Sequence, residues 1–433
     1  MSELNPKELA EKNRVTDPEI IKAILTTGFN FSEFQELALY HRDGFFERKV
    51  DFPRTMPMLP QLLTPFFGKC VGEFAFDLYS TYSKPPCPNP VFLSLGAGQG
   101  YLDSDLISHL TNSTLEDSRF PEHSKYIREN STFIVSDRTR NSIERLNTEL
   151  SDLILNTKLL GRIKIERVNA LDFDLGGLPF GIVYANELLD DMPTEPIVKI
   201  GEMMYVIKLL AYIRYSRTEN FDGKKTIQQQ FKNLDGLLSR ISAERRINIG
   251  DTYSIGFLPV SIPLSYDESL AKRVSSVTTL GNIDSSDFGG IYPVHIGLDS
   301  FFESIRKSFQ HGVIIIIDYS SIAQGCCNWN RALTTFKNYK FGKEDIDFEI
   351  DPMQVVAKAQ SHGIKTVDVV PLSYVLDMFR VLFPFPTEAN FPIWLKKNKK
   401  PDSHESKEIY MQMYDALNSK GYLARNVVMR FIF

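Results

Sequence analysis

The stretch Pro90-Val-Phe-Leu-Ser-Leu-Gly-Ala-Gly-Gln-Gly-Tyr-Leu102 decides how the rest of the sequence is interpreted. Its apolar run, Val91 to Leu95, is typical of a buried parallel strand, and apolar residues recur at helical spacing from Leu102 to Leu110. Between the two lie three glycines at alternate positions, Gly96, Gly98 and Gly100. A strand, a glycine turn and a helix in this order form the nucleotide site of α/β sheets, because glycine allows positive φ and lets the backbone approach a ligand.

The spacing of these glycines separates two classes of nucleotide site. Dinucleotide-binding turns have the pattern G-x-G-x-x-G, whereas this turn has G-x-G-x-G, so a dinucleotide oxidoreductase is a weaker interpretation. The observed form is typical of methyltransferases that use S-adenosylmethionine (SAM), in which the turn passes under the methionine part of the cofactor. We therefore expect Gly96, Gly98 and Gly100 to bind SAM; the alternative is a glycine-rich turn without a ligand.

The composition is that of a globular protein with more than one structural unit. At 433 residues, the chain is long enough for about two to three domains, or for one large domain with insertions. Hydrophobic residues make up 43% and charged residues 24%, which supports a large buried core. The net charge is -5, with 49 basic and 54 acidic residues, so a broad nucleic-acid surface is not expected.

The four cysteines, Cys70, Cys87, Cys326 and Cys327, form no C-x-x-C pair. The sequence therefore predicts neither a disulfide framework nor a metal site, and it favours a reducing, intracellular compartment. No segment approaches the ~18 consecutive apolar residues that a membrane span needs. The polar, acid-bearing residues 1–19 resemble neither a signal peptide nor a typical mitochondrial presequence.

Further apolar runs alternate with helical patterns along the chain, which indicates a sheet covered by helices on both faces. The predicted strands are 91–95, 132–137, 163–168, 180–185, 313–318, 366–370 and 426–433. We therefore expect an α/β fold of the Rossmann-like, class I SAM-dependent methyltransferase type, with a mostly parallel seven-stranded sheet.

Long segments between the strands predict additions to this core. Residues 1–85 should form a helical N-terminal extension that contributes to the site, and 86–193 the first part of the core. Residues 194–300 are too long for a simple crossover, so we expect an inserted, substrate-facing subdomain there. Residues 301–433 should complete the core, with a helical insertion near 371–424.

Acidic residues follow the second and third predicted strands. Asp137 ends the second strand, where a carboxylate accepts hydrogen bonds from ribose hydroxyls; the alternative is a helix cap. Asp172 follows the third strand, where it would accept from the adenine amino group while Leu171 or Phe173 packs on the ring. The alternative for Asp172 is an ordinary loop aspartate. We expect Asp137, Leu171 and Asp172 to bind the cofactor.

The densest group of polar residues follows the fourth predicted strand: Asn186-Glu-Leu-Leu-Asp-Asp-Met-Pro193. Open sheets bind ligands at the carboxyl ends of their strands, so these side chains should lie near the cofactor's methyl group. We expect Asn186 to contact the methionine end of SAM and the acids to orient a nucleophile or remove its proton. A guanidinium group is a specific candidate, because its N–H donors match paired carboxylates. The alternative is a capped turn before Pro193.

Together these motifs resemble the MidA-like methyltransferases, a family that includes the mitochondrial protein arginine methyltransferase that assists assembly of respiratory complex I. The likeness covers nearly the whole chain, in the right order. Its parts are Phe34-Gln-Glu-Leu-Ala-Leu-Tyr-His41 with Gly44-Phe-Phe46, the glycine turn, Asn186 to Pro193, and Asp318-Tyr319 followed by a late block at 331–347. Ala97 and Gln99 stand where the family usually has proline and arginine, so the chain would be a divergent member.

The resemblance implies SAM-dependent methylation of a protein arginine. It implies catalytic roles for Glu187 and Asp190, with Glu187 positioning the guanidinium, and cofactor contacts at the glycine turn, Asp137 and Asp172. It also implies a protein substrate, a mitochondrial location and a role in complex I assembly, and it leaves a homodimer open. The residues themselves leave open a small-molecule or RNA methyltransferase, and a binding or assembly protein that kept the fold and lost turnover.

Overall fold

The computed structural model describes residues 10–41, 44–47, 66–82, 89–112, 118–156, 159, 161–215, 253–277, 291–320, 346–372, 374–375 and 426–433. Outside these residues lie Cys87, Cys326 and Cys327, almost all of the insertion expected near 371–424, and most of the late block at 331–347.

The chain divides into two units, each assembled from segments far apart in the sequence. Unit 1 consists of Met1–Arg48, Asp190–Gly297 and Gly325–Gln354. Unit 2 consists of Lys49–Leu189, Leu298–Gln324 and Val355–Phe433. The glycine turn and all of the other predicted cofactor residues therefore belong to unit 2.

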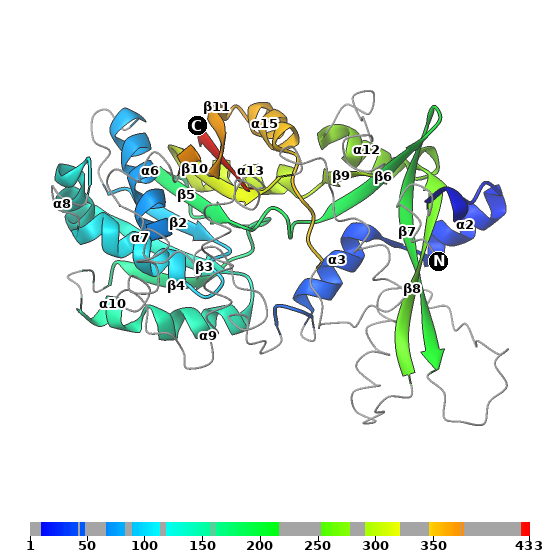
Figure 1. The fold of residues 1–433 in the computed structure, drawn as a ribbon, viewed down its shortest axis with the longest axis horizontal. Coiled ribbons are helices and arrows are strands. Elements are labelled where there is room, and N and C mark those ends of the chain that lie inside the picture. The colour runs from blue at the N-terminus through cyan, green and yellow to red at the C-terminus, as the bar shows by residue number, and fades with distance from the viewer. Residues whose placement is uncertain are drawn as a thin grey trace, which may run out of the picture. The chain divides into compact units, whose positions relative to one another are not determined.

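Unit 2 is built on a seven-stranded sheet (Figure 1). In spatial order its strands are β11 (Lys365–Pro371), β12 (Asn426–Ile432), β10 (Phe309–Tyr319), β5 (Leu178–Asn186), β2 (Val91–Leu95), β3 (Thr132–Asp137) and β4 (Ile163–Arg167). Neighbours from β10 to β4 pair in parallel, whereas β12 is antiparallel to both β10 and β11. The α/β class is confirmed, but the sheet is mixed. The sequence could not show this, because an apolar run does not reveal the direction of its strand.

Helices cover both faces of this sheet, which is why its strands are so apolar. Strand β2 is buried at every position. On one face, α6 (Phe66–Tyr82) and α7 (Tyr101–Asn112) belong to a core that includes Phe92 of β2 and Phe133 of β3. On the opposite face, α13 (Leu298–Ser308) places Phe302 against Phe431 of β12, with ring centroids 6.1 Å apart. The other helices described around this sheet are α8 (Pro121–Asn130), α9 (Arg140–Glu149), α10 (Ser151–Asn156) and α15 (Pro352–Ser361).

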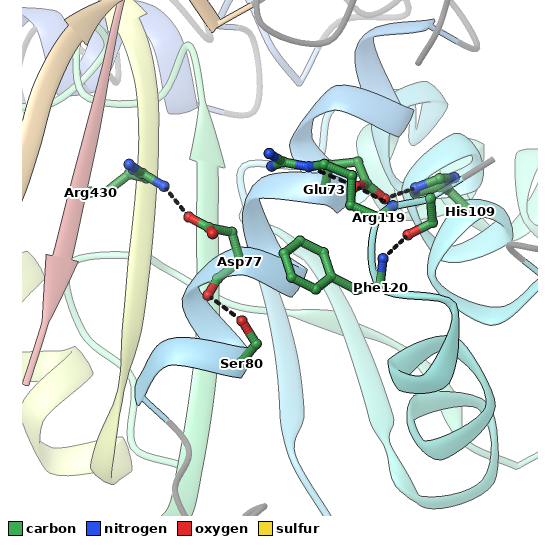
Figure 2. A network of polar contacts seen from close by, with 8 residues as sticks. Glu73, Asp77, Ser80, His109, Arg119, Phe120 and Arg430 are labelled. Carbon is green, nitrogen blue, oxygen red and sulfur yellow. Dashed lines mark hydrogen bonds and ion pairs between the residues drawn. The ribbon is translucent and has the colours of Figure 1, made fainter. Parts of the chain in front are cut away.

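Polar side chains join α6 to its neighbours (Figure 2). The buried carboxylate of Glu73 lies 3.0 Å from Nε2 of His109 and accepts the backbone N–H of Arg119 at 3.1 Å. Burial acts to raise the pKa of Glu73, but the hydrogen bonds that it accepts outweigh burial and lower it. Farther along α6, Asp77 accepts a hydrogen bond from Arg430 of β12 at 3.0 Å. These contacts fix the helix that precedes β2 to both α7 and the sheet.

Unit 1 contains a five-stranded sheet of antiparallel pairs. Its strands are β1 (Phe29–Asn30), β6 (Thr194–Ile200), β7 (Met203–Tyr215), β8 (Tyr253–Pro263) and β9 (Ile291–His295), and β7 and β8 form a long twisted pair in Figure 1. Helices α2 (Pro18–Thr27), α3 (Phe31–Tyr40) and α12 (Glu268–Val277) belong to the same unit. Because Phe29 pairs with Leu209, the N-terminal segment and the inserted segment share one sheet.

Candidate functional site

The glycine turn between β2 and α7 has the left-handed backbone that its sequence allows. The φ angle is 67° at Gly96, 58° at Gly98 and 82° at Gly100, values at which a residue with a Cβ is strained. A methyl group added at Gly96 would lie 2.8 Å from Cδ1 of Leu188, whereas one added at Gly98 would meet no described atom within 4 Å. The turn is therefore packed at Gly96 and open at Gly98.

Asp137, at the end of β3, holds the glycine turn in place. Its Oδ2 accepts the N–H of Gly98 at 3.0 Å, and its Oδ1 accepts the N–H and the hydroxyl of Thr139 at 2.9 and 3.1 Å. Burial raises the pKa of Asp137, and these hydrogen bonds act against that shift. The side chain of Ser142 also hydrogen-bonds to Asp137, and a carboxylate has about four acceptor positions, so a ribose hydroxyl would have to replace one of these partners. The contact with ribose stays a prediction, and the bonds to Thr139 also match the alternative of a cap.

A second buried carboxylate, Asp103, lies in the first turn of α7. Its Oδ1 accepts the hydroxyl hydrogen of Tyr184 in β5 at 2.7 Å, so it ties the helix after the glycine turn to a neighbouring strand. Burial raises the pKa of Asp103 to about 6, although hydrogen bonds from Ser94 and Tyr184 act to lower it. Asp103 is not among the predicted site residues, but it has a signal in the sequence: an acid between Leu102 and Leu106, on the apolar side of a helix.

The unfolding free energy should depend on pH through Asp103. A carboxyl group whose pKa is raised on folding binds its proton more tightly in the native state, so stability falls as the pH rises from about 4 to about 6. Each pH unit in this window costs about 1.4 kcal/mol. The Asp103→Asn variant cannot ionise at this position, so its stability should fall less steeply across the window; the contributions of other buried carboxyl groups, such as Glu195, are the same in both proteins. Urea unfolding of both proteins between these pH values measures the difference; parallel curves would contradict the assignment.

The turn that follows β5 lies beside the glycine turn. Strands β2 and β5 pair in parallel with Leu95 opposite Ala185. The next residues, Gly96 and Asn186, therefore lie together at the edge of the sheet that is formed by the carboxyl ends of its parallel strands. Glu187 follows with a φ of 49°, which is unusual for a residue other than glycine, and its side chain is buried. Backbone strain of this kind is concentrated at functional sites. The structure thus brings the glycine turn and the start of the predicted acidic motif together.

Two polar atoms at this edge are buried without a hydrogen-bond partner in the part of the chain that is described. They are Nε2 of Gln99, in the glycine turn, and Oδ1 of Asn186, at the end of β5. Buried polar groups in folded proteins are nearly always paired, so this arrangement suits a polar ligand. One atom donates and the other accepts, so a matching ligand must offer both an acceptor and a donor. Gln99 was noted in the sequence only for its departure from the family pattern.

Leu171 and Asp172 lie in the turn after β4. The N–H of Leu171 donates to Oδ1 of Asn169 at 3.1 Å, and the N–H of Asp172 donates to the backbone oxygen of Asn169 at 2.9 Å. The N–H of Val168 donates to the backbone oxygen of Asp137 at 3.0 Å, which places this turn next to the end of β3. Leu171 is half-buried and Asp172 is exposed, so the predicted adenine contact stays a prediction.

The two predicted catalytic acids belong to different units. Glu187 lies in unit 2 and Asp190 in unit 1. Asp190 is buried, and its backbone oxygen accepts the N–H of Phe348 at 3.0 Å. The structure therefore anchors each acid separately, and a joint role for them stays a prediction.

Within the described ranges, no group of three or more His, Cys, Asp and Glu side chains is placed to hold a metal ion. The same residues include no helix that is long and apolar enough to cross a membrane. Cys70 is a free, buried cysteine, and burial raises its pKa far above the usual range. Such a thiol is unreactive at neutral pH, so Cys70 serves the packing of α6.

The fold is shared with two solved structures at low sequence identity. One is a COG1565 superfamily member from Burkholderia thailandensis, described as a likely methyl transferase and bound to S-adenosyl-homocysteine. It is 15% identical to this chain, with a TM-score of 0.56, and the match covers 96% of this chain and 94% of that chain. The other is an uncharacterized protein of the same superfamily and organism, with 15% identity, the same coverage of 96% and 94%, and a TM-score of 0.53. At this identity the likeness establishes the fold alone, which is a methyltransferase fold. No protein-family model and no curated protein matches the sequence.

Proposed function

We propose that this protein is a SAM-dependent methyltransferase whose cofactor lies across the glycine turn and the turn after β5. The observation that carries the proposal is the pair of unpartnered polar atoms at this edge of the described structure, the donor Nε2 of Gln99 and the acceptor Oδ1 of Asn186. The methionine part of SAM has a carboxylate that accepts and an ammonium group that donates, so it can satisfy both atoms. The S-adenosyl-homocysteine in one of the structures with the same fold supports this choice of ligand.

The other residues of this edge suit the remaining parts of the cofactor. Gly98 has no described atom within 4 Å of an added methyl group, which leaves room for a ligand against its backbone. Asp137 would accept a ribose hydroxyl in place of one of its side-chain partners, Thr139 or Ser142. Leu171 and Asp172 follow the next strand, where we place the adenine. When bound, SAM supplies an electrophilic methyl group on a positively charged sulfur.

We further propose that the methyl acceptor is an arginine side chain of a protein. Glu187 would accept two N–H groups of the guanidinium, because a carboxylate and a guanidinium match in a planar, bidentate pair. This contact orients the group and draws its positive charge toward the carboxylate, which leaves the nitrogen farthest from Glu187 as the nucleophile. Alignment of the two reacting atoms supplies much of the rate. Asp190 is the second acid assigned to the guanidinium, on the strength of the family resemblance.

Other parts of the family resemblance remain predictions: a role in complex I assembly, a mitochondrial location and a homodimer. A small-molecule or RNA acceptor, and a binding protein without turnover, are the competing functions. None of these is favoured by a specific contact of the described residues.

The choice of acceptor is tested with the whole chain, tritiated SAM and two pools of random short peptides. One pool carries a central arginine, and the matched pool carries lysine at that place. We expect the arginine pool to be labelled at least tenfold faster than the lysine pool, because lysine cannot form the planar bidentate pair. A tenfold ratio corresponds to a difference of about 1.4 kcal/mol in the activation free energy. Equal labelling would contradict arginine specificity. Binding of S-adenosylhomocysteine in calorimetry without label in either pool would favour the competing functions, and absence of binding would contradict a methyltransferase.

A further inference from the structure

Asp318 is the last residue but one of β10, and its carboxylate accepts three backbone N–H groups. Its Oδ2 accepts the N–H of Leu189 at 2.8 Å and the N–H of Leu188 at 3.3 Å, and its Oδ1 accepts the N–H of Tyr319 at 2.7 Å. Asp318 is fully buried, with 0% of its surface exposed to solvent. Leu188 and Leu189 directly follow Glu187, so Asp318 binds the turn that carries the proposed catalytic acid.

Strand β10 also binds Glu187 itself. The backbone N–H of Glu187 donates to the oxygen of Ile317 at 2.8 Å, and Asn186 lies opposite Ile317 in the parallel register of β5 and β10. Three successive N–H groups, from Glu187 to Leu189, therefore all donate to Ile317 and Asp318. Successive N–H groups in a turn with a left-handed residue form a concavity that binds an anion, and here the anion is the Asp318 carboxylate.

This arrangement explains how a glutamate keeps a left-handed backbone. A φ of 49° is unfavourable for Glu187, and such strain persists only where the surroundings hold it in place. Hydrogen bonds to a buried charged acceptor are stronger than those between neutral groups, so Asp318 is well suited to hold the turn. Glutamine or asparagine at position 318 would offer one acceptor oxygen and present an NH2 group to the N–H donors.

We infer that Asp318 is the positioning residue that sets the direction of the Glu187 side chain for methyl transfer. The inference rests on the proposed function, because Asp318 would act on the reaction only by positioning Glu187. The N–H groups that Asp318 accepts do not belong to the cofactor residues: Asn186 is held by the ladder between β5 and β10, and the glycine turn by Asp137, although Leu188 packs on Gly96. Loss of Asp318 should therefore lower the rate of transfer much more than it lowers cofactor affinity.

The main variant is Asp318→Asn, and the matched control is Asp368→Asn. Asp368 lies in the same unit and accepts a hydrogen bond from Arg430 at 2.8 Å, so the control also removes a partly buried carboxylate from its partner. With the arginine peptide pool, we expect kcat to fall about 100-fold in Asp318→Asn, the loss expected for a misplaced catalytic group. The affinity for S-adenosylhomocysteine should change much less than kcat, because Asp137 still holds the glycine turn. In the control, only the melting temperature should fall. Equal kcat values for the two variants would overturn the inference.

A double variant shows whether Asp318 acts through Glu187. In a Glu187→Gln background, adding Asp318→Asn should lower kcat no further, because the group that Asp318 positions is already gone. A second full drop of about 100-fold would mean that Asp318 acts on the reaction by another route and would overturn the inference. If Asp318→Asn does not fold, Asp318→Glu replaces it; this variant keeps the acceptor oxygens and should retain part of kcat, and a wild-type rate in it would contradict a positional role.

Amide hydrogen exchange separates a failure of this inference from a failure of the proposed function. In the wild type, the amides of Leu188 and Leu189 should be protected, and in Asp318→Asn they should exchange at least about tenfold faster while the amides of β2 stay unchanged. This readout needs neither cofactor nor acceptor. If the peptides receive no methyl group, the proposed acceptor is wrong and exchange alone decides the role of Asp318. Unchanged exchange at Leu188 and Leu189 would overturn the inference even in an active enzyme.

Discussion

Replacing Glu187 by glutamine lowers kcat for arginine peptides about a thousandfold and leaves the affinity for S-adenosylhomocysteine unchanged. Glutamine has the size of glutamate but no charge, and its NH2 group would face the N–H donors of the guanidinium. The backbone strain is the same in both proteins, because both residues carry a Cβ at a φ of 49°. The loss therefore reports the carboxylate and not the fold of the turn.

Steady-state methyl transfer with the arginine pool measures this effect, and calorimetry measures the affinity for S-adenosylhomocysteine. Glu144→Gln is the control, since Glu144 lies on the surface of α9 in an ion pair with Arg140 at 3.0 Å. It should be fully active. A rise in KM with an unchanged kcat would mean that Glu187 only binds the acceptor, and a variant with wild-type kcat and KM would remove Glu187 from the reaction.

The Gly98→Ala variant should weaken binding of S-adenosylhomocysteine at least about 100-fold while it stays folded. No described atom lies within 4 Å of the added methyl group, so the free protein has room for it there. The remaining cost is the positive φ of 58°, on the order of 1 kcal/mol for an L-residue. A ligand that lies against the backbone of this turn, however, must compete with the new methyl group for the same space.

Gly363 provides a control with the same backbone problem far from the glycine turn in the sequence. It follows α15 with a φ of 74°, and an added methyl group there also meets no described atom within 4 Å. Gly363→Ala should lose a similar small amount of stability, a few degrees in Tm, and bind S-adenosylhomocysteine like the wild type. If the two variants bind it equally well, the glycine turn is not the cofactor site.

Much of the sheet could be predicted from local patterns. The run Val91–Leu95 and the run Thr132–Asp137 are strands with the expected bounds, because a short, continuous apolar run between turn residues favours a buried strand. The antiparallel course of β12 could not be predicted, since its apolar pattern would serve either direction. The division of the chain between Leu189 and Asp190 was also not foreseen, because it depends on contacts between distant segments.

The candidate site divides in the same way between local and distant information. The glycine turn and the turn after β5 could be predicted, since each is a short motif next to a strand. The contacts of Asp318 with Leu188 and Leu189 could not, because these residues are about 130 positions apart and meet only when β10 pairs with β5. Asp103 itself has a local signal, but its partner could not be predicted, because Tyr184 lies 81 positions away in the sequence.

A crystal structure with S-adenosylhomocysteine shows whether the glycine turn is the cofactor site. We expect the ligand to lie over the carboxyl ends of β2 and β5, with its amino-acid group within hydrogen-bonding distance of Nε2 of Gln99 and Oδ1 of Asn186. Binding elsewhere on the protein, or no bound ligand at millimolar concentration, would contradict this expectation.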